Sequence, residues 1–209
     1  MKFLFPIFVA LNSWTVAHAT DAWDSQFTRQ NISLDLSQVY AWSDNDFLRI
    51  VVTVSTQKSP AKILPYTFFS PRGRYVVHVD TDGNLQPDLE FAFYISAKGE
   101  VLLQAFEQEW RGILNETIAM ESTRAMAGLA KTPEFGDAHS LKQWVLSQKR
   151  CIPSAANELR CFPSSRKEPN DDYADMMTGF LSLEIPVSVL KLSNATAKVN
   201  VWATTWNKL

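Results

Sequence analysis

The sequence predicts a mainly β protein, an antiparallel β-sandwich with two inserted helices. Short segments with alternating apolar residues recur along the chain, and this pattern is typical of half-buried strands. Turn residues separate these segments, and the lack of a regular strand–helix alternation disfavours a doubly wound α/β fold. A chain of 209 residues without an internal repeat fits one domain.

Residues 1–19 have the composition of a secretory signal peptide. Lys2 leads into an apolar run that Pro6 interrupts, and the run is shorter than the roughly 20 residues of a membrane span. Ala17 and Ala19 form the small-x-small pair that signal peptidases recognise. We therefore predict cleavage after Ala19, rather than a buried N-terminal helix, and a single mature domain in the periplasm or secreted from the cell.

Seven segments are predicted to be strands because apolar residues alternate within them and turn residues bound them. A Ser-Asp-Asn-Asp turn precedes the second segment, and a Lys-Gly turn precedes the fifth. The segments are Asn31–Leu36, Phe47–Thr56, Arg74–Asp80, Leu89–Ser96, Glu100–Trp110, Gly179–Val187 and Ala197–Trp206.

The middle of the chain is predicted to be a helical insertion over about residues 115–149. In Glu116–Lys131, the apolar residues recur at helical spacing; they are Ile118, Ala125, Met126 and Leu129. A second helix is expected to begin after Asp137, a good N-cap residue, and to place Leu141, Trp144 and Val145 on one face. We expect both helices to lie across the sandwich.

The two cysteines, Cys151 and Cys161, are predicted to form a disulfide because the chain is expected to reach an oxidising compartment. A bridge over so short a loop stabilises by roughly 2–3 kcal/mol in the chain-entropy model. The polar segment over residues 151–175 is expected to be a long loop tied by this bridge.

The most informative segment is Asp-Thr-Asp-Gly-Asn-Leu-Gln-Pro-Asp, between two predicted strands. Asp80, Asp82, Asn84 and Asp88 stand at positions 1, 3, 5 and 9 of this run. Calcium takes six to eight oxygen ligands, and carboxylates and carbonyls on a tight loop suit it. The alternative is a turn without metal, because Gly83 supplies the positive φ that tight hairpins need. Both interpretations stand on the sequence alone, although the position of Gly83 excludes an EF-hand.

Several segments of the chain resemble a secreted bacterial family classed as a domain of unknown function. The opening Asp-Leu-Ser-Gln-Val-Tyr-Ala-Trp is similar to the family's Asp-Leu-Ser/Thr-x-Val-Tyr-Ala-aromatic. The Asp-x-Asp-Gly-Asn loop and the closing Gly-Phe-x-x-x-Glu-x-Pro and Trp-Ala-Thr segments follow in the family's order. The family's central Gly-Leu-Arg-Asp-Asp-Pro segment is replaced here. The resemblance implies a secreted, mostly β fold and no established activity.

Candidate catalytic residues are few, so the sequence favours a protein that is not an enzyme. His78 and Asp80 point to the same strand face and form a possible metal pair, although a solvent-facing histidine is the more ordinary interpretation. No Gly-x-Ser-x-Gly elbow is present. Glycosidases use two carboxyl groups about 5–10 Å apart, and a pair of that kind remains open among Glu90, Glu107, Glu109 and Asp175.

The composition disfavours some classes of binding partner. The net charge of −2 and the lack of a basic stripe disfavour nucleic acid, and the mature chain has no long apolar run for a membrane helix. Among the tryptophans, Trp42 and Trp202 are expected to be structural, whereas Trp23 and Trp206 are freer to be exposed and to stack on sugars.

Three functions are therefore considered. The first is an exported, non-catalytic envelope or extracellular binding protein, stabilised by calcium, that recognises a glycan or another envelope component. The second is a periplasmic hydrolase that uses paired carboxylates or a metal near His78 and Asp80. The third is a structural protein of envelope assembly. Carboxylates gathered in one pocket would favour the enzyme, and an aromatic strip would favour the binding protein.

Overall fold

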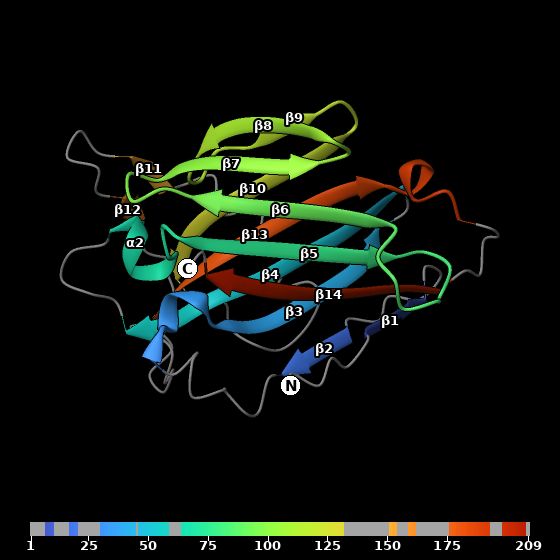
Figure 1. Cartoon of the computed structure of the whole chain (residues 1–209), viewed down its shortest axis with the longest axis horizontal. Coiled ribbons are helices and arrows are strands. Elements are labelled where there is room, and N and C mark those ends of the chain that lie inside the picture. Colours follow the sequence, from blue (N-terminus) through green and yellow to red (C-terminus); the bar gives the residue numbers. More distant parts are fainter. Residues whose placement is uncertain are drawn as a thin grey trace.

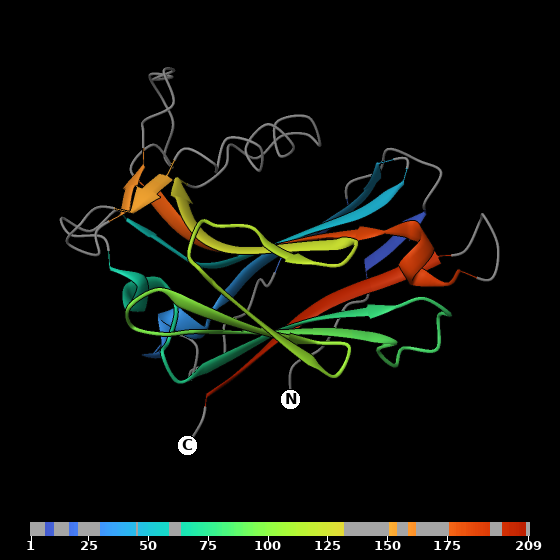
Figure 2. The ribbon, with the colours of Figure 1, turned by 90° about the horizontal axis from the view of Figure 1, so that it is seen from above.

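The structure is a computed structural model, and it describes residues 7–10, 17–20, 30–44, 46–58, 64–131, 151–153, 159–161, 176–192 and 198–207. Two six-stranded antiparallel sheets form the two layers of a sandwich (Figures 1 and 2). The fold class predicted from the alternating segments, a mainly β protein, is therefore confirmed. Among the described helices, none is long and apolar enough to cross a membrane.

The first layer, sheet A, contains the loop with the acidic residues. Every neighbouring pair of its strands is antiparallel. Its strands, in spatial order, are β1 (Ile7–Ala10), β14 (Lys198–Asn207), β5 (Gly73–Asp80), β6 (Leu89–Ile95), β7 (Glu100–Ala105) and β8 (Gln108–Ile113).

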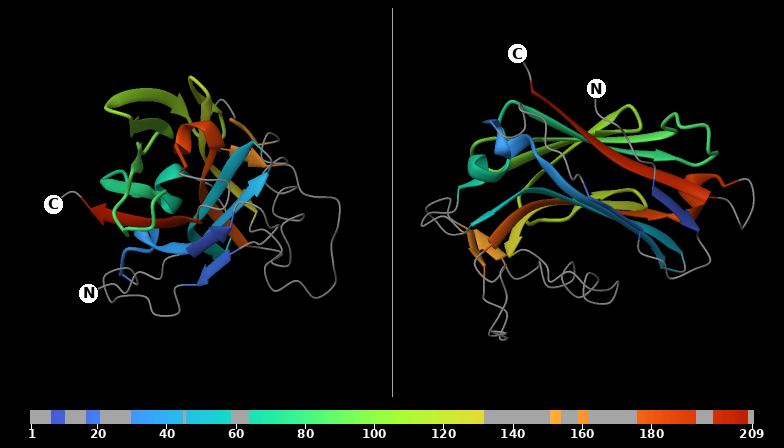
Figure 3. Two further views of the ribbon diagram at one scale, coloured as in Figure 1. Left: turned by 90° about the vertical axis from the view of Figure 1, so that its right-hand side faces the viewer. Right: turned by 90° about the horizontal axis from the view of Figure 1, so that it is seen from below.

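The second layer, sheet B, lies behind sheet A in Figure 1, and Figure 3 shows the same two layers from other sides. Its central pair, β4 and β13, is long and continuous apart from one register shift near Gly179. Its strands, in spatial order, are β2 (Ala17–Thr20), β3 (Leu36–Asp44), β4 (Phe47–Lys58), β13 (Met176–Pro186), β10 (Thr123–Lys131) and β9 (Ile118–Met120).

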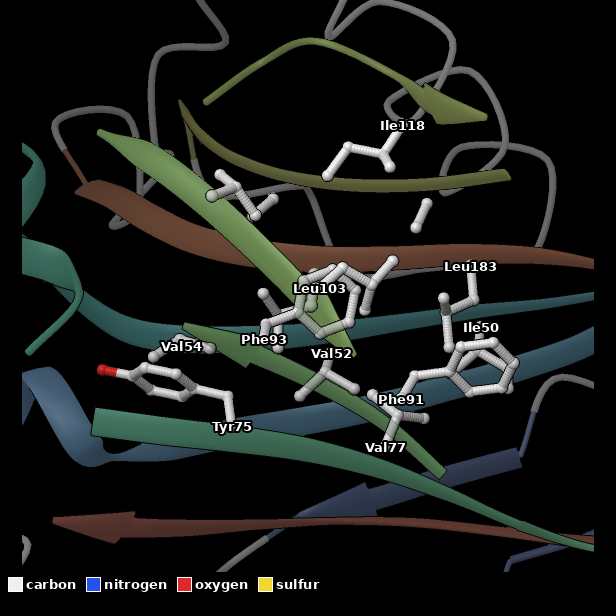
Figure 4. Close-up of a cluster of buried hydrophobic side chains, with 14 of the residues drawn as sticks. Ile50, Val52, Val54, Tyr75, Val77, Phe91, Phe93, Leu103, Ile118 and Leu183 are labelled. Carbon is white, nitrogen blue, oxygen red and sulfur yellow. The ribbon is translucent and has the colours of Figure 1, made fainter. Parts of the chain in front are cut away.

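The core fills the space between the sheets because every second side chain of each strand points inward. Figure 4 shows residues of both sheets meeting there. The residues labelled in Figure 4 are at most 4% exposed, as expected for a packed interior. They include Val77, Phe91, Phe93 and Leu103 from sheet A and Ile50, Val52, Val54 and Leu183 from sheet B.

Within the described residues, three short helices lie at the ends of strands. They are η1 (Ile32–Leu34), α2 (Pro65–Phe68) and η3 (Val187–Leu190). The α2 helix has a proline in its first turn, and Phe68 and the following Phe69 are fully buried. The Phe69 ring meets the Tyr75 ring edge-on, with centroids 5.5 Å apart, so α2 closes one end of the sandwich with aromatic side chains.

The predicted helix over Glu116–Lys131 is wrong, because this segment is the β-hairpin of β9 and β10. Ala125, Ala127 and Leu129 alternate into the core, whereas Met126 points to the other face of sheet B. Alanine and methionine are good helix formers, but pairing with β13 along the whole of β10 overrides that local preference. The helix predicted after Asp137 lies outside the described residues.

Two strand predictions also need correction. Asn31–Leu36 is not a strand: Ile32–Leu34 forms a 3-10 turn, with Leu34 N–H donating to the Asn31 carbonyl (2.8 Å), and β3 begins at Leu36. Glu100–Trp110 is two strands, β7 and β8, rather than one. Phe106 and Glu107 both have positive φ (49° and 60°) and form the turn between them. The lack of glycine or asparagine there hides this turn in the sequence.

The segment predicted as a long loop after Cys151 contains a further element. The short strands β11 (Cys151–Pro153) and β12 (Leu159–Cys161) pair antiparallel as a separate two-stranded sheet. At the other end of the chain, β1 pairs with β14 and β2 pairs with β3. Both strands lie almost entirely within the predicted signal peptide, whose cleavage stays a prediction.

Candidate metal site at the β5–β6 loop

The loop between β5 and β6 carries the acidic residues that the sequence singles out. β5 ends at Asp80 and β6 begins at Leu89, and the two strands pair up to Val79 and Leu89. The backbone N–H of Asp88 donates to the carbonyl of Val79 (2.9 Å) and closes the base of the loop. Residues 82–88 are exposed and form a tip at one end of sheet A (Figure 1).

Asp80, at the base of the loop, holds the loop backbone through hydrogen bonds. Its side chain is fully buried, and its Oδ1 accepts hydrogen bonds from the backbone N–H groups of Asp82 (3.1 Å) and Gly83 (2.7 Å). Its Oδ2 accepts from the N–H of Leu85 (2.9 Å) and from Nδ2 of Asn200 (2.7 Å) on β14. A carboxylate offers about four lone-pair sites, so these four donors account for its hydrogen-bonding capacity.

The exposed acids of the loop are held by local bonds. Asp82 accepts from the backbone N–H and the side-chain amide of Asn84, both at 3.0 Å. Asn84 Oδ1 in turn accepts from the N–H of Gln86 (2.6 Å). Asp88 Oδ2 accepts from both the N–H and the hydroxyl of Thr81, each at 2.7 Å. The loop is thus a series of short side-chain-to-backbone turns.

The backbone conformation of the loop requires two residues with positive φ. Gly83 has φ of 82°, as its role in the predicted turn requires. Leu85 has φ of 64° although it is not a glycine and is 60% exposed. Sequence analysis missed Leu85, since a leucine carries no signal for this conformation. The hydrogen bond from its N–H to Asp80 holds it in place.

Three of the four predicted ligands come together. Asp80, Asp82 and Asp88 each offer a carboxylate oxygen, and these three oxygens lie within 4.8 Å of one another. Calcium–oxygen distances are about 2.3–2.6 Å, so oxygens on opposite sides of one ion lie up to about 5 Å apart. The three oxygens are therefore close enough to share one ion, which would take the place of one of the four donors on Asp80, and Asn84 lies beside them through its contact with Asp82. Among the described residues this is the one acidic or metal-ligating cluster of its kind.

Burial and hydrogen bonding act in opposite directions on Asp80. Burial by itself raises the pKa of this carboxyl. The hydrogen bonds from Asn200 and from the N–H groups of Leu85, Gly83 and Asp82 outweigh it and hold the pKa below its usual value. Asp80 is thus charged at neutral pH, because its charged form is the one that the four donors stabilise.

The lowered pKa of Asp80 predicts that acid destabilises the protein. A carboxyl with a lower pKa in the folded state stabilises the fold above the unfolded-state pKa of about 3.9, and this contribution disappears as the pH falls through the folded pKa. We expect the free energy of unfolding to fall below about pH 4, and to fall less steeply in Asp80→Asn. Urea unfolding over this range measures both slopes, and equal slopes would contradict the prediction.

Asn200 is a further residue of the candidate site that the sequence did not single out. It stands opposite Asp80 in the register of β14 and β5 and is fully buried. Its Nδ2 donates to Asp80, while its Oδ1 is buried and has no hydrogen-bond partner among the described residues. Buried amide oxygens are seldom left without a partner. A polar residue between Val199 and Val201 is the available sequence signal, but nothing local links it to the loop.

His78 does not join the acidic cluster, so the predicted His78–Asp80 metal pair finds no support there. It lies on the outer face of sheet A, as predicted, but is only 5% exposed. Its ring stacks on Trp202, with centroids 5.1 Å apart, and Nε2 contacts Thr204 Oγ1 at 2.7 Å. Burial lowers the pKa of His78, and neighbouring Glu90, 2.8 Å from Nδ1, partly opposes this. These contacts describe a packed structural histidine.

The other predicted acids have separate surroundings. Glu90 faces His78, and Glu109 accepts a hydrogen bond from Gln104 Nε2 at 2.7 Å. Glu107 is exposed in the β7–β8 turn, and Asp175 lies outside the described residues. In the described part of the chain, none of these acids belongs to a three-residue metal-binding group.

The strand pairing bears on the predicted disulfide. Cys151 and Cys161 are opposite partners in the β11–β12 pair. Opposite residues of an antiparallel pair have Cα atoms about 4.5–5.5 Å apart, which is within the range that disulfides span. The backbone register is thus compatible with the bridge, whose formation stays a prediction.

The chain matches no protein-family model, and no curated protein and no solved structure was found to be similar to it. The resemblance to a secreted family of unknown function therefore stays a prediction.

Proposed function

We propose that the protein is an exported, non-catalytic binding protein of the cell envelope or extracellular space, and that calcium at the β5–β6 loop stabilises it. Its ligand is a glycan or another envelope component. The observation that carries the calcium part is the meeting of three carboxylate oxygens within 4.8 Å at the tip of one hairpin. Calcium is the cation that such an oxygen-only set suits best.

The loop has a reason to bind a cation. Asp82 and Asp88 are exposed, and they lie close to the buried charge of Asp80. Like charges at this distance repel one another, and a bound divalent cation removes that repulsion. The anchored position of Asp80, with its donors on both the loop and β14, holds the loop ready for the ion. Asn84 and backbone carbonyls of the loop would complete the shell.

The binding role is supported by the outer face of sheet A. Trp206 on β14 is 47% exposed, in agreement with the expectation that this tryptophan is free to contact a ligand. Trp42, in contrast, is buried in a second cluster on the outer face of sheet B, with Tyr40, Val51, Met126 and Phe180. Exposed aromatic rings on a sheet face can stack on sugars. Trp23 lies outside the described residues.

Calcium is expected to raise the melting temperature of the protein. A ligand that binds only the folded state stabilises it by about 2.7 kcal/mol at a hundred times its Kd, which is about 5–10 °C for a chain of this size. Magnesium should have a smaller effect because it demands octahedral geometry and dehydrates reluctantly. Differential scanning calorimetry in millimolar calcium and in EDTA measures the shift.

Two variants make this test specific. Asp82→Ala should abolish the calcium-dependent shift and leave the fold intact, because Asp82 is exposed and its bonds are confined to the loop. Asp46→Ala is the matched control, since Asp46 is an exposed acid in the β3–β4 turn of the other sheet. If the wild-type melting temperature is the same in calcium and in EDTA, the loop is only a turn.

A further inference from the structure

A groove lies on the outer face of sheet A, at the opposite end of β5 and β6 from the acidic loop. Its walls come from β6, β7 and β8 and from the segment after α2, at the left-hand end in Figure 1. Its lining combines an aromatic side chain and two charged side chains with apolar and small polar ones. The lining residues include Pro71, Tyr94, Ser96, Glu100, Leu102 and Arg111.

The strand register places a row of side chains that runs from this groove to Trp206. Trp206 is opposite Arg74 in the β14–β5 pair, Tyr94 is opposite Leu102, and Leu102 is opposite Arg111. Arg74 is one residue before the Tyr75–Phe93 pair, which brings it beside Tyr94. The five side chains thus form one row across five strands. With strands about 4.8 Å apart, the row is roughly 20 Å long.

The row carries positive charge that is not neutralised within the described part of the chain. The Arg74 guanidinium lies over the Trp206 ring, 5.3 Å from its centroid, and its Nε is buried without a hydrogen-bond partner. Arg111 is exposed, and no ion pair joins it to a described acid. The acid that lines the groove, Glu100, contacts Ser96. This excess of arginine stands out in a chain of net charge −2.

We propose that this row and groove bind a carboxylated oligosaccharide, such as a chain of uronic acids; the inference takes the glycan as ligand and so rests on the proposed function. Aromatic rings offer apolar faces on which sugar rings stack. Guanidinium groups bind carboxylates with paired hydrogen bonds. In this row Trp206 lies beside Arg74, and Tyr94 lies between the two arginines. This arrangement matches a polymer in which each sugar unit has both an apolar face and a carboxylate.

The charge part of the proposal is tested with two probes that share one backbone. Short oligogalacturonates carry a carboxylate on every sugar, and their methyl esters carry none. Titration calorimetry in EDTA, which keeps calcium from cross-linking the polyanion, is expected to detect the acid form and not the ester. Binding should weaken as salt is added, because the arginines are exposed. Equal binding of acid and ester would overturn the carboxylate assignment, and so would equal binding of inorganic phosphate.

Variants locate the site. Arg111→Gln removes one charged contact and is expected to weaken oligogalacturonate binding about tenfold or more. Trp206→Ala is expected to weaken the binding of the same probe through lost stacking. Arg124→Gln on sheet B, whose side chain is 68% exposed, is the matched control and should bind as the wild type does. Full binding by both site variants, with melting temperatures like that of the control, would place the ligand elsewhere.

The outcome is separable from that of the calcium proposal. The groove and the acidic loop lie at opposite ends of β5, beside Arg74 and after Asp80 respectively. A calcium-dependent melting shift without oligogalacturonate binding would overturn the groove assignment and leave the calcium site standing. Oligogalacturonate binding without a calcium-dependent melting shift would overturn the calcium site and leave the groove assignment standing.

Discussion

Replacement of Asp80 by alanine is expected to destabilise the protein by about 3 kcal/mol, because it removes the acceptor of four hydrogen bonds. The three backbone donors belong to the loop and can turn toward water. The side-chain amide of Asn200 cannot, since this residue is fully buried. A buried polar group that loses its partner costs about 1–3 kcal/mol. The loop should also lose its shape and with it any affinity for calcium.

Urea unfolding at neutral pH measures this loss, and two further variants test its cause. Asp88→Ala removes bonds to Thr81 at the exposed tip and is expected to cost less than about 1 kcal/mol. The double variant Asp80→Ala/Asn200→Ala should cost less than the sum of the two single changes, because the residues are partners. Equal losses for Asp80→Ala and Asp88→Ala would contradict the organising role of Asp80.

Gly128→Ala is expected to destabilise the protein by about 2–3 kcal/mol, as overpacked interiors do. A Cβ atom at this position would lie 2.2 Å from Asn115 Oδ1 and 2.5 Å from the Phe180 ring. Asn115 cannot easily move, because its Oδ1 accepts from the N–H of Leu129 (2.9 Å) and its own N–H donates to the Ala127 carbonyl (2.8 Å). The added methyl group therefore meets a fixed neighbour.

Whether Gly128→Ala lowers or raises the free energy of unfolding distinguishes the observed strand from the helix that local propensity favours. In an exposed helix, the same substitution would stabilise the protein by about 1 kcal/mol. Asn115→Gly tolerates the positive φ of 65° at this site and removes the amide. In that background, Gly128→Ala should cost less, since only the contact with Phe180 remains. Chemical denaturation of the four proteins gives the comparison, and a stabilising Gly128→Ala would contradict the strand.

The fold class and most of the strands follow from the sequence because their signal is local. Alternation in Arg74–Asp80 and Leu89–Ser96 marks β5 and β6 within one or two residues. Assignment from local patterns fails where one pattern is compatible with both a helix and a strand. Glu116–Lys131 has helix-forming residues at helical spacing, yet it also alternates. Its hydrogen bonds with β13, whose residues pair with it from 46 to 60 positions further along the chain, decide in favour of the strand.

In the acidic loop, too, some contacts follow from the local sequence and others depend on residues far away in the chain. The sequence by itself determined that Asp80, Asp82, Asn84 and Asp88 form one oxygen-rich turn around Gly83, because every bond among them lies within nine residues. Only the tertiary structure decided that Asn200, 120 positions away, anchors Asp80 from β14. It likewise decided that Trp206, Arg74, Tyr94 and Arg111 form one row. Strand order and register set such neighbours, and these depend on packing between distant segments that no local pattern records.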